Sequence, residues 1–131
     1  SFAPAGLPEY TIQDSVTTIG YGAFAYCSSL TSVTIPNSVT TIGAWAFRGC
    51  SSLTSVTIPD SVTAIGIYAF YNCSSLTSVY CKVVTPPAGG SSMFSSNASG
   101  RKIYVPMESV EAYKSASGWS IYADSIVGYN F

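Results

Sequence analysis

Apolar residues recur along the chain at intervals of 23 residues. Residues 28–50 read SSLTSVTIPNSVTTIGAWAFRGC, and residues 51–73 read SSLTSVTIPDSVTAIGIYAFYNC. In each LTSVTI segment, Val and Ile alternate with Ser and Thr, which is the period of a strand with one buried face. We predict one strand per unit, in Leu30–Ile35, Leu53–Ile58 and Leu76–Cys81. Because their spacing is equal, we expect these strands to pair in a parallel ladder.

The rest of each unit carries a second set of fixed residues. Pro36 and Pro59 should end the strands, because proline cannot donate a ladder hydrogen bond. The Val-x-x-Ile-Gly segment that follows is expected to turn the chain, with its glycine adopting unusual backbone angles. An Ala-Phe pair then begins a predicted short helical or 3₁₀ stretch, and its phenylalanine should fill the interior. The fixed positions are Val16, Val39 and Val62, Ile19, Ile42 and Ile65, Gly20, Gly43 and Gly66, Ala23, Ala46 and Ala69, and Phe24, Phe47 and Phe70.

The length of the unit indicates the fold class. A period of 20–29 residues with an L-x-x-L-x-L-like strand is typical of leucine-rich repeats, in which stacked units share one core. We predict an α/β fold: a right-handed solenoid with short parallel strands, a 23-residue repeat and a C-terminal helical cap. The solenoid should span residues 1–106, with a degenerate half-repeat at 1–13, regular repeats at 14–81 and an irregular last repeat at 82–106. Residues 107–131 should form the cap.

Both ends depart from the regular unit. Subtracting one period from Leu30, Val33 and Ile35 gives Leu7, Tyr10 and Ile12, which suggests a worn half-repeat. Near the other end, Phe94 should take the place of Phe70 after a one-residue insertion, and KIYVP should form a last strand with Ile103 and Val105 inward. The segment MESVEAYKSASGW then predicts a short helix. This helix, with Trp119, Tyr122 and Ile126, should cover the end of the core.

Composition excludes several classes of function. Charged residues make up 8% of the chain and the net charge is −1, so the five Lys and Arg residues offer no field for nucleic acid. No apolar run reaches the roughly 18 residues of a membrane span, and no leader is recognisable at SFAPAGLPEY. The chain contains no histidine, the commonest general base and metal ligand. We therefore predict no enzyme activity, no metal and no cofactor.

The four cysteines leave two interpretations. Cys27, Cys50 and Cys73 share one register, so adjacent coils would bring them within disulfide distance. A row of three leaves one unpaired, however, and the same register should hold them all inside as small apolar thiols. Cys81 stands where earlier units have isoleucine, which favours reduced core thiols at all four positions.

Candidate binding residues come from the columns that vary between units. Fixed columns are explained by packing, whereas columns that hold Gly, Trp, Tyr or Arg should lie outside. This places a set of residue types enriched at interaction hot spots on or near the surface. The alternative is that these side chains only fill the flank between coils. A second candidate is the strand face, where Ser32, Ser55 and Ser78, with Thr34, Thr57 and Tyr80, should offer hydroxyls to a glycan or a protein. The candidate interaction surface is Tyr26, Trp45, Arg48, Tyr68 and Tyr71.

The unit IPxSVTxIGxxAFxxCSSLTSVT resembles the BspA-like class of bacterial leucine-rich repeats, and IYVPMESVEAYKSASGW resembles the closing segment of such proteins. The resemblance implies a cell-surface or secreted bacterial module that binds proteins or glycoproteins, including those of a host matrix. It assigns no functional residue, because the pattern defines a scaffold. A non-enzymatic adhesin-type module is therefore the first hypothesis. The alternatives are a carbohydrate-binding or accessory domain of a larger secreted enzyme, and a structural spacer.

Overall fold

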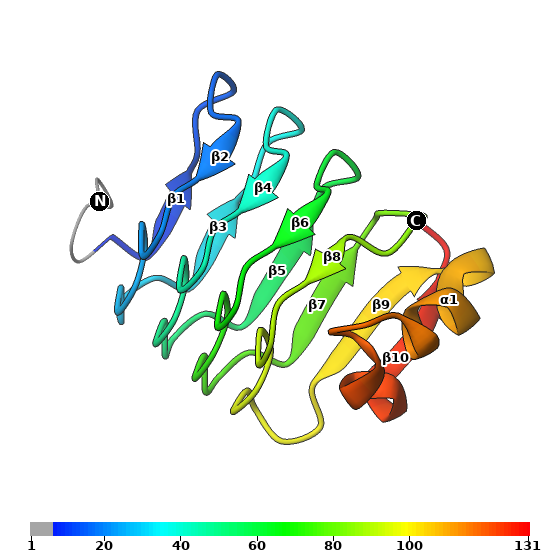
Figure 1. The fold of residues 1–131 in the computed structure, drawn as a ribbon. Helices are drawn as coiled ribbons and strands as arrows, with labels where there is room; N and C mark the ends of the chain where they lie inside the picture. Colours follow the sequence, from blue (N-terminus) through cyan, green and yellow to red (C-terminus); the bar gives the residue numbers. More distant parts are fainter. Residues whose placement is uncertain (1–6) are drawn as a thin grey trace.

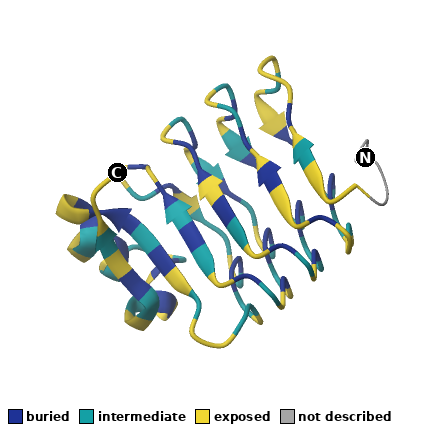
Figure 2. Ribbon diagram, turned by 180° about the vertical axis from the view of Figure 1, so that it is seen from behind, coloured by how far each residue is buried: buried dark blue, intermediate teal, exposed yellow. Residues whose placement is uncertain are grey.

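The computed structural model describes residues 7–131, and these residues form a row of stacked coils (Figure 1). Each of the first four coils contributes one strand to each of two rows of parallel strands. The leucine-rich-repeat fold expected from the period is therefore confirmed. Buried residues, almost all of them apolar, occur in every coil and on both rows of strands, so the core runs along the whole stack (Figure 2).

The first row contains the strands that the sequence predicts. Its members are β1 (Glu9–Thr11), β3 (Ser32–Thr34), β5 (Ser55–Ile58), β7 (Ser78–Cys81), β9 (Lys102–Pro106) and β10 (Ile126–Tyr129). β1 pairs with β3, and β5, β7, β9 and β10 form one sheet, with all pairs parallel. β3 lies beside β5, where the Thr54 amide donates to the Thr31 carbonyl at 3.4 Å (Figure 1). The parallel arrangement is confirmed, although each predicted strand starts two residues later, at its serine.

A second row of strands was not foreseen. β2 (Thr18–Ile19), β4 (Thr41–Ile42), β6 (Ala64–Ile65) and β8 (Ala88–Gly89) form a four-stranded parallel sheet in that order. β2, β4 and β6 occupy the Val-x-x-Ile-Gly segments, which we expected to be turns, and β8 lies in the corresponding PPAGG segment of the irregular repeat. The glycine that follows each of them does not need unusual angles either. A Cβ on Gly43 would lie 2.7 Å from the Ile19 carbonyl oxygen, so glycine is required there for close approach between coils.

The Ala-Phe segments are consecutive turns, not the helical or 3₁₀ stretches that we predicted. These turns lie at residues 21–26, 44–49 and 67–72, and a fourth turn at 91–96 has Met93-Phe94 in place of Ala-Phe. Their alternate amides point to the next coil: Trp45 N donates to Ile67 O at 3.0 Å, Phe47 N to Ala69 O at 2.7 Å, and Gly49 N to Tyr71 O at 2.9 Å. A helix would need those donors internally, so the bonding between coils explains the difference.

The centre of the core is a column of stacked phenylalanine rings. Phe24, Phe47, Phe70 and Phe94 are each at most 1% exposed, and successive ring centroids are 5.0, 5.0 and 5.4 Å apart. The predicted role of Phe94 is confirmed, as are the inward positions of Ile103 and Val105.

The N-terminal half-repeat is partly as predicted, with its residues 1–6 outside the described part of the chain. Ile12 is buried and the Tyr10 ring packs on Phe24 at 5.5 Å. Leu7, however, is 45% exposed and does not reach the core. β1 nevertheless pairs with β3 at an offset of one period, with Glu9 opposite Ser32.

The cysteine thiols are all free in the structure, but their burial differs. Cys50, Cys73 and Cys81 are completely buried, and the thiols of Cys50 and Cys73 each contact a phenylalanine carbonyl of the preceding coil at 3.1 Å. Cys27 is half-buried, so its predicted burial is wrong. It belongs to the first turn, which has a described neighbouring turn on one side only.

The C-terminal segment closes the stack as a crossover between two strands. After β9 come the 3₁₀ helix η1 (Met107–Ser109), the helix α1 (Val110–Ser115), the 3₁₀ helix η2 (Ser120–Ser125) and then β10, which pairs with β9. Tyr113 and Trp119 are fully buried, and the Trp119 Nε1 donates to the Pro87 carbonyl at 2.8 Å. Tyr122 and Ile126 are also buried, as predicted, whereas β10 itself was missed. The division into a solenoid of residues 1–106 and a cap of 107–131 stays a prediction.

Candidate functional site

The predicted interaction residues lie in the row of turns that links β2, β4, β6 and β8 to the following strands. We call this row the turn ridge: residues 20–27, 43–50, 66–73 and 90–97. It follows the lower edge of the stack in Figure 1. Because each coil places the same register on the ridge, side chains that are 23 residues apart in sequence become neighbours in space.

The structure brings all five predicted residues into one aromatic–arginine cluster, which consists of Tyr26, Trp45, Arg48, Tyr68 and Tyr71. The Arg48 Cζ atom lies 4.1 Å from the ring centroid of Trp45, 5.4 Å from that of Tyr71 and 5.5 Å from that of Tyr26. The Tyr68 centroid lies 5.0 Å from those of both Trp45 and Tyr71. Three successive coils therefore contribute to one group of contacts.

One further aromatic residue adjoins the cluster and was left out of the predicted set. Tyr21 is 75% exposed, and its ring centroid lies 6.3 Å from that of Trp45. The sequence contained the signal, because Tyr21, Ala44 and Ile67 occupy a variable column directly after the fixed glycine. The group of rings is therefore larger than we predicted, although it spans the same three coils.

Burial within the cluster is uneven. Tyr26 is 61% exposed, whereas Trp45, Arg48, Tyr68 and Tyr71 are half-buried by one another and by neighbouring turns. These four side chains thus fill space between coils and still present part of their surface to solvent. Both earlier interpretations, contact surface and flank packing, agree with this exposure.

The backbone of the cluster adopts a conformation that suits glycine better than an aromatic residue. Tyr26, Trp45 and Tyr68 have φ of 61°, 64° and 57°. This left-handed region costs an L-residue roughly 1–2 kcal/mol. The equivalent positions of other coils carry the less bulky residues Gly22, Gly49, Asn72, Ser92 and Ser96, which also have positive φ. The fold thus accepts small residues at these positions, and the aromatic ones occupy them at a cost in strain.

Arg48 has no acceptor for its donors in the described part of the chain. No side-chain hydrogen bond or ion pair of Arg48 occurs among residues 7–131, and its Nε is buried without a partner. It is also the sole charged residue of the turn ridge. The ridge is therefore weakly positive at one point and apolar around it.

The strand face carries a second aromatic group near the C-terminal end. Tyr80 and Tyr104 stack with centroids 4.9 Å apart, and Tyr129 meets both rings edge-on at 5.5 Å. Beside them is a depression of about 290 Å³ whose lining includes Thr57, Lys82 and Phe131. The predicted hydroxyl face is present in the earlier coils, where Ser55 pairs with Ser78 in register.

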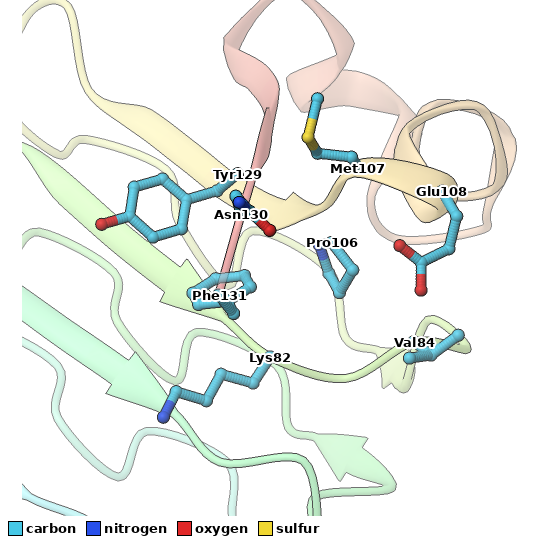
Figure 3. A pocket seen from close by; sticks show the side chains of 8 residues that line it. All are labelled: Lys82, Val84, Pro106, Met107, Glu108, Tyr129, Asn130 and Phe131. Carbon is cyan, nitrogen blue, oxygen red and sulfur yellow. The ribbon is translucent and has the colours of Figure 1, made fainter.

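A smaller hollow of about 240 Å³ adjoins this depression (Figure 3). Lys82 and Glu108 both line it, together with Tyr129 and Phe131. The two charged side chains extend from different segments at its border, and Phe131 lies between Tyr129 and Lys82 in the view. This hollow shares Lys82, Tyr129 and Phe131 with the larger depression, so the two form one indented area.

The family follows from comparison with known sequences. The model of the BspA type leucine rich repeat region matches residues 1–117 in six copies. The chain belongs to this family. Leucine-rich repeats generally mediate protein interactions, and this family is typically non-enzymatic and commonly surface-associated in bacteria. A comparison with curated proteins finds no match.

Metal-ligating groups, a buried thiol and helix length complete the description of this BspA-type chain. Among the described residues, no group of three or more His, Cys, Asp or Glu side chains is arranged to hold a metal ion. Burial raises the pKa of the Cys81 thiol to about 11, which disfavours the nucleophilic thiolate at neutral pH. Within residues 7–131, no helix is long and apolar enough to cross a membrane.

Proposed function

We propose that this BspA-type chain is a non-enzymatic protein-binding module and that the aromatic–arginine cluster, extended by Tyr21, is its contact surface. The observation that carries the proposal is the left-handed backbone of Tyr26, Trp45 and Tyr68. Packing is satisfied at equivalent positions by residues as small as glycine, so selection for the aromatic side chains requires another reason. Tyr, Trp and Arg dominate binding energy at protein interfaces.

We further propose an adhesin-type role at a bacterial cell surface or in secreted form, with a protein or glycoprotein partner such as one from a host matrix. The family's common surface association supports this location. An exposed row of rings across successive coils also suits a broad partner surface, because solenoids offer extended faces and not deep pockets.

The alternative is a carbohydrate-binding or accessory module of a larger secreted enzyme. The tyrosine group of the strand face favours it, because Tyr80 and Tyr129 line a depression that also contains a threonine and a lysine. Aromatic rings combined with a few convergent polar groups are typical of small-ligand sites. The remaining possibility is a spacer without a ligand. A spacer would need no exposed aromatic residues, either on the turn ridge or on the strand face.

A paired substitution experiment tests the proposal. The purified chain is applied to arrays of matrix proteins and glycans, and the affinity for any ligand found is measured for Trp45→Ala and Tyr68→Ala. We expect each substitution to weaken binding by about 1–3 kcal/mol, because both remove a ring from the contact surface.

Tyr104→Ala is the matched control, since Tyr104 is a half-buried stacked tyrosine on the other face. It should leave affinity unchanged. If Tyr104→Ala weakens binding and the two ridge substitutions do not, the strand face is the site and the carbohydrate alternative gains support. Circular dichroism must show that all three variants remain folded.

A further inference from the structure

The uncompensated charge of Arg48 indicates what kind of partner the ridge accepts. The guanidinium lies among the rings of Tyr26, Trp45 and Tyr71, which belong to three different coils. None of its five N–H groups donates to another described residue, and Nε is shielded from water. Buried donors in native proteins are usually satisfied, so a donor without an acceptor calls for an explanation.

An external carboxylate supplies acceptors for the two terminal NH2 groups of the guanidinium, whereas Nε is enclosed by the protein and takes no part in this pairing. Guanidinium groups bind carboxylates through two parallel hydrogen bonds, and the pairing strengthens where aromatic neighbours exclude water. The half-buried state of Arg48 leaves part of the side chain open to an incoming group. The turn ridge contains no acidic residue that could compete for it.

The surface next to the cluster distinguishes a polypeptide from a glycan. A shallow groove of about 370 Å³ crosses β4, β6 and β8 and includes Ala44 and Ile67, the residues directly before Trp45 and Tyr68. Its lining is glycine, alanine and isoleucine apart from Thr41. Sugar hydroxyls placed there would lose water without gaining partners, which is unfavourable. Aliphatic side chains of a polypeptide form no hydrogen bonds with water, so their burial in the groove is favourable.

From these observations we infer that the turn ridge binds an acidic polypeptide segment, with a carboxylate on Arg48 and an adjacent aliphatic side chain in the groove of β4, β6 and β8. The inference rests on the proposed function, because it names the partner class for the same surface. It makes the charge of Arg48 the determinant of specificity and the aromatic rings the source of much of the contact area.

A phage-displayed library of random 12-residue peptides, selected on the intact chain, provides the probe. We expect the selected peptides to share an Asp or Glu next to Leu, Ile or Val. In one such peptide, replacing the acid by its amide should lower affinity on the order of 10- to 100-fold, the range for losing a hydrogen-bonded charged group. Arg48→Gln should cause a similar loss. If the peptide acid and Arg48 act as one pair, replacing the acid by its amide should cause no further loss of affinity for the Arg48→Gln variant.

Two further variants keep the test specific. Arg48→Lys retains the charge without the planar fork and should lose part of the affinity. Lys114→Gln removes a positive charge from α1, away from the ridge, and should leave binding unchanged.

If selected peptides depend on Trp45 but not on Arg48 or an acid, the acidic partner is wrong while the contact surface stands. Peptides insensitive to Trp45, Tyr68 and Arg48 overturn both proposals. A library without binders, or Arg48-dependent binding of acidic glycans alone, overturns the polypeptide inference.

Discussion

A single column of glycines determines how closely the coils of the second sheet approach one another. A Cβ on Gly66 would lie 2.3 Å from the Ala44 amide nitrogen, and one on Gly90 would lie 2.3 Å from the Ile67 nitrogen. Real Cβ atoms do not come this close to backbone, so a larger residue would push two coils apart. Gly20, in the same column of the first coil, would meet nothing within 4 Å.

This difference predicts the outcome of two otherwise identical substitutions. Gly66→Ala should lower the free energy of unfolding by about 2–3 kcal/mol, because overpacking forces the backbone to shift. Gly20→Ala should change it by no more than about 0.5 kcal/mol, as at an uncrowded surface position. Urea denaturation followed by circular dichroism measures both. Equal effects of the two substitutions would show that coil spacing does not depend on this column.

At the scale of elements, neighbouring coils are joined by two strand ladders and by the hydrogen bonds of the turn ridge. The phenylalanine column runs inside these three contacts, with ring planes within 8° of parallel between Phe24 and Phe47 and within 5° between Phe47 and Phe70. Phe47 therefore packs between two rings, whereas Trp45, two residues earlier, lies half-buried on the outside.

Truncating these two aromatic residues should give different losses of stability. Phe47→Ala should cost about 3–5 kcal/mol, because it leaves a cavity in the middle of the column. Trp45→Ala should cost about 1–2 kcal/mol, because only part of the ring leaves a packed environment. Chemical denaturation of both variants provides the comparison. If Trp45→Ala destabilises the chain as much as Phe47→Ala, Trp45 is a core residue and the proposed contact surface is wrong.

At the scale of the whole molecule, the side chains with strongly raised pKa values lie in the interior. Burial raises the pKa of Cys81 from 9.0 to about 11, and the neighbouring Cys73 thiol together with burial raises the pKa of Cys50. Burial and the neighbouring Cys81 thiolate raise the pKa of Tyr113. In each case folding favours the neutral, protonated form.

These shifts predict a loss of stability at alkaline pH. Because the folded pKa values exceed the unfolded ones, their contribution is complete below about pH 8.5 and falls as the pH rises toward 11. For Cys81 the difference between 9.0 and about 11 corresponds to about 3 kcal/mol at most. The urea midpoint should therefore decrease between pH 7.5 and pH 10.5. Cys81→Ile, which copies Ile58 of the preceding coil, should make the decrease smaller, and an unchanged midpoint in the parent chain would contradict the prediction.

How much of this structure the sequence could predict depends on the range of each signal. The 23-residue period gave the register of Ser55 opposite Ser78, and it placed the phenylalanine column correctly. The two-residue strands such as β4 are too short to show an alternating pattern. β10 pairs with β9 only after a crossover, so nothing local indicates it. The variable columns identified the members of the cluster, but their mutual ring contacts depend on positive φ values that composition does not reveal.

The near-identity of successive interfaces has a consequence for how such a chain can change by recombination. Gly43 N donates to Ile19 O and Gly66 N donates to Ile42 O at the same 2.7 Å, and the ring spacing of the phenylalanine column repeats as well. A DNA crossover between equivalent codons of two coils would therefore delete or duplicate one unit and recreate the same junction on both sides. The C-terminal segment from η1 to β10 would remain on the last coil. The length of the chain can thus vary in whole steps of 23 residues. Each added unit lengthens the turn ridge and packs on the existing core with the same contacts.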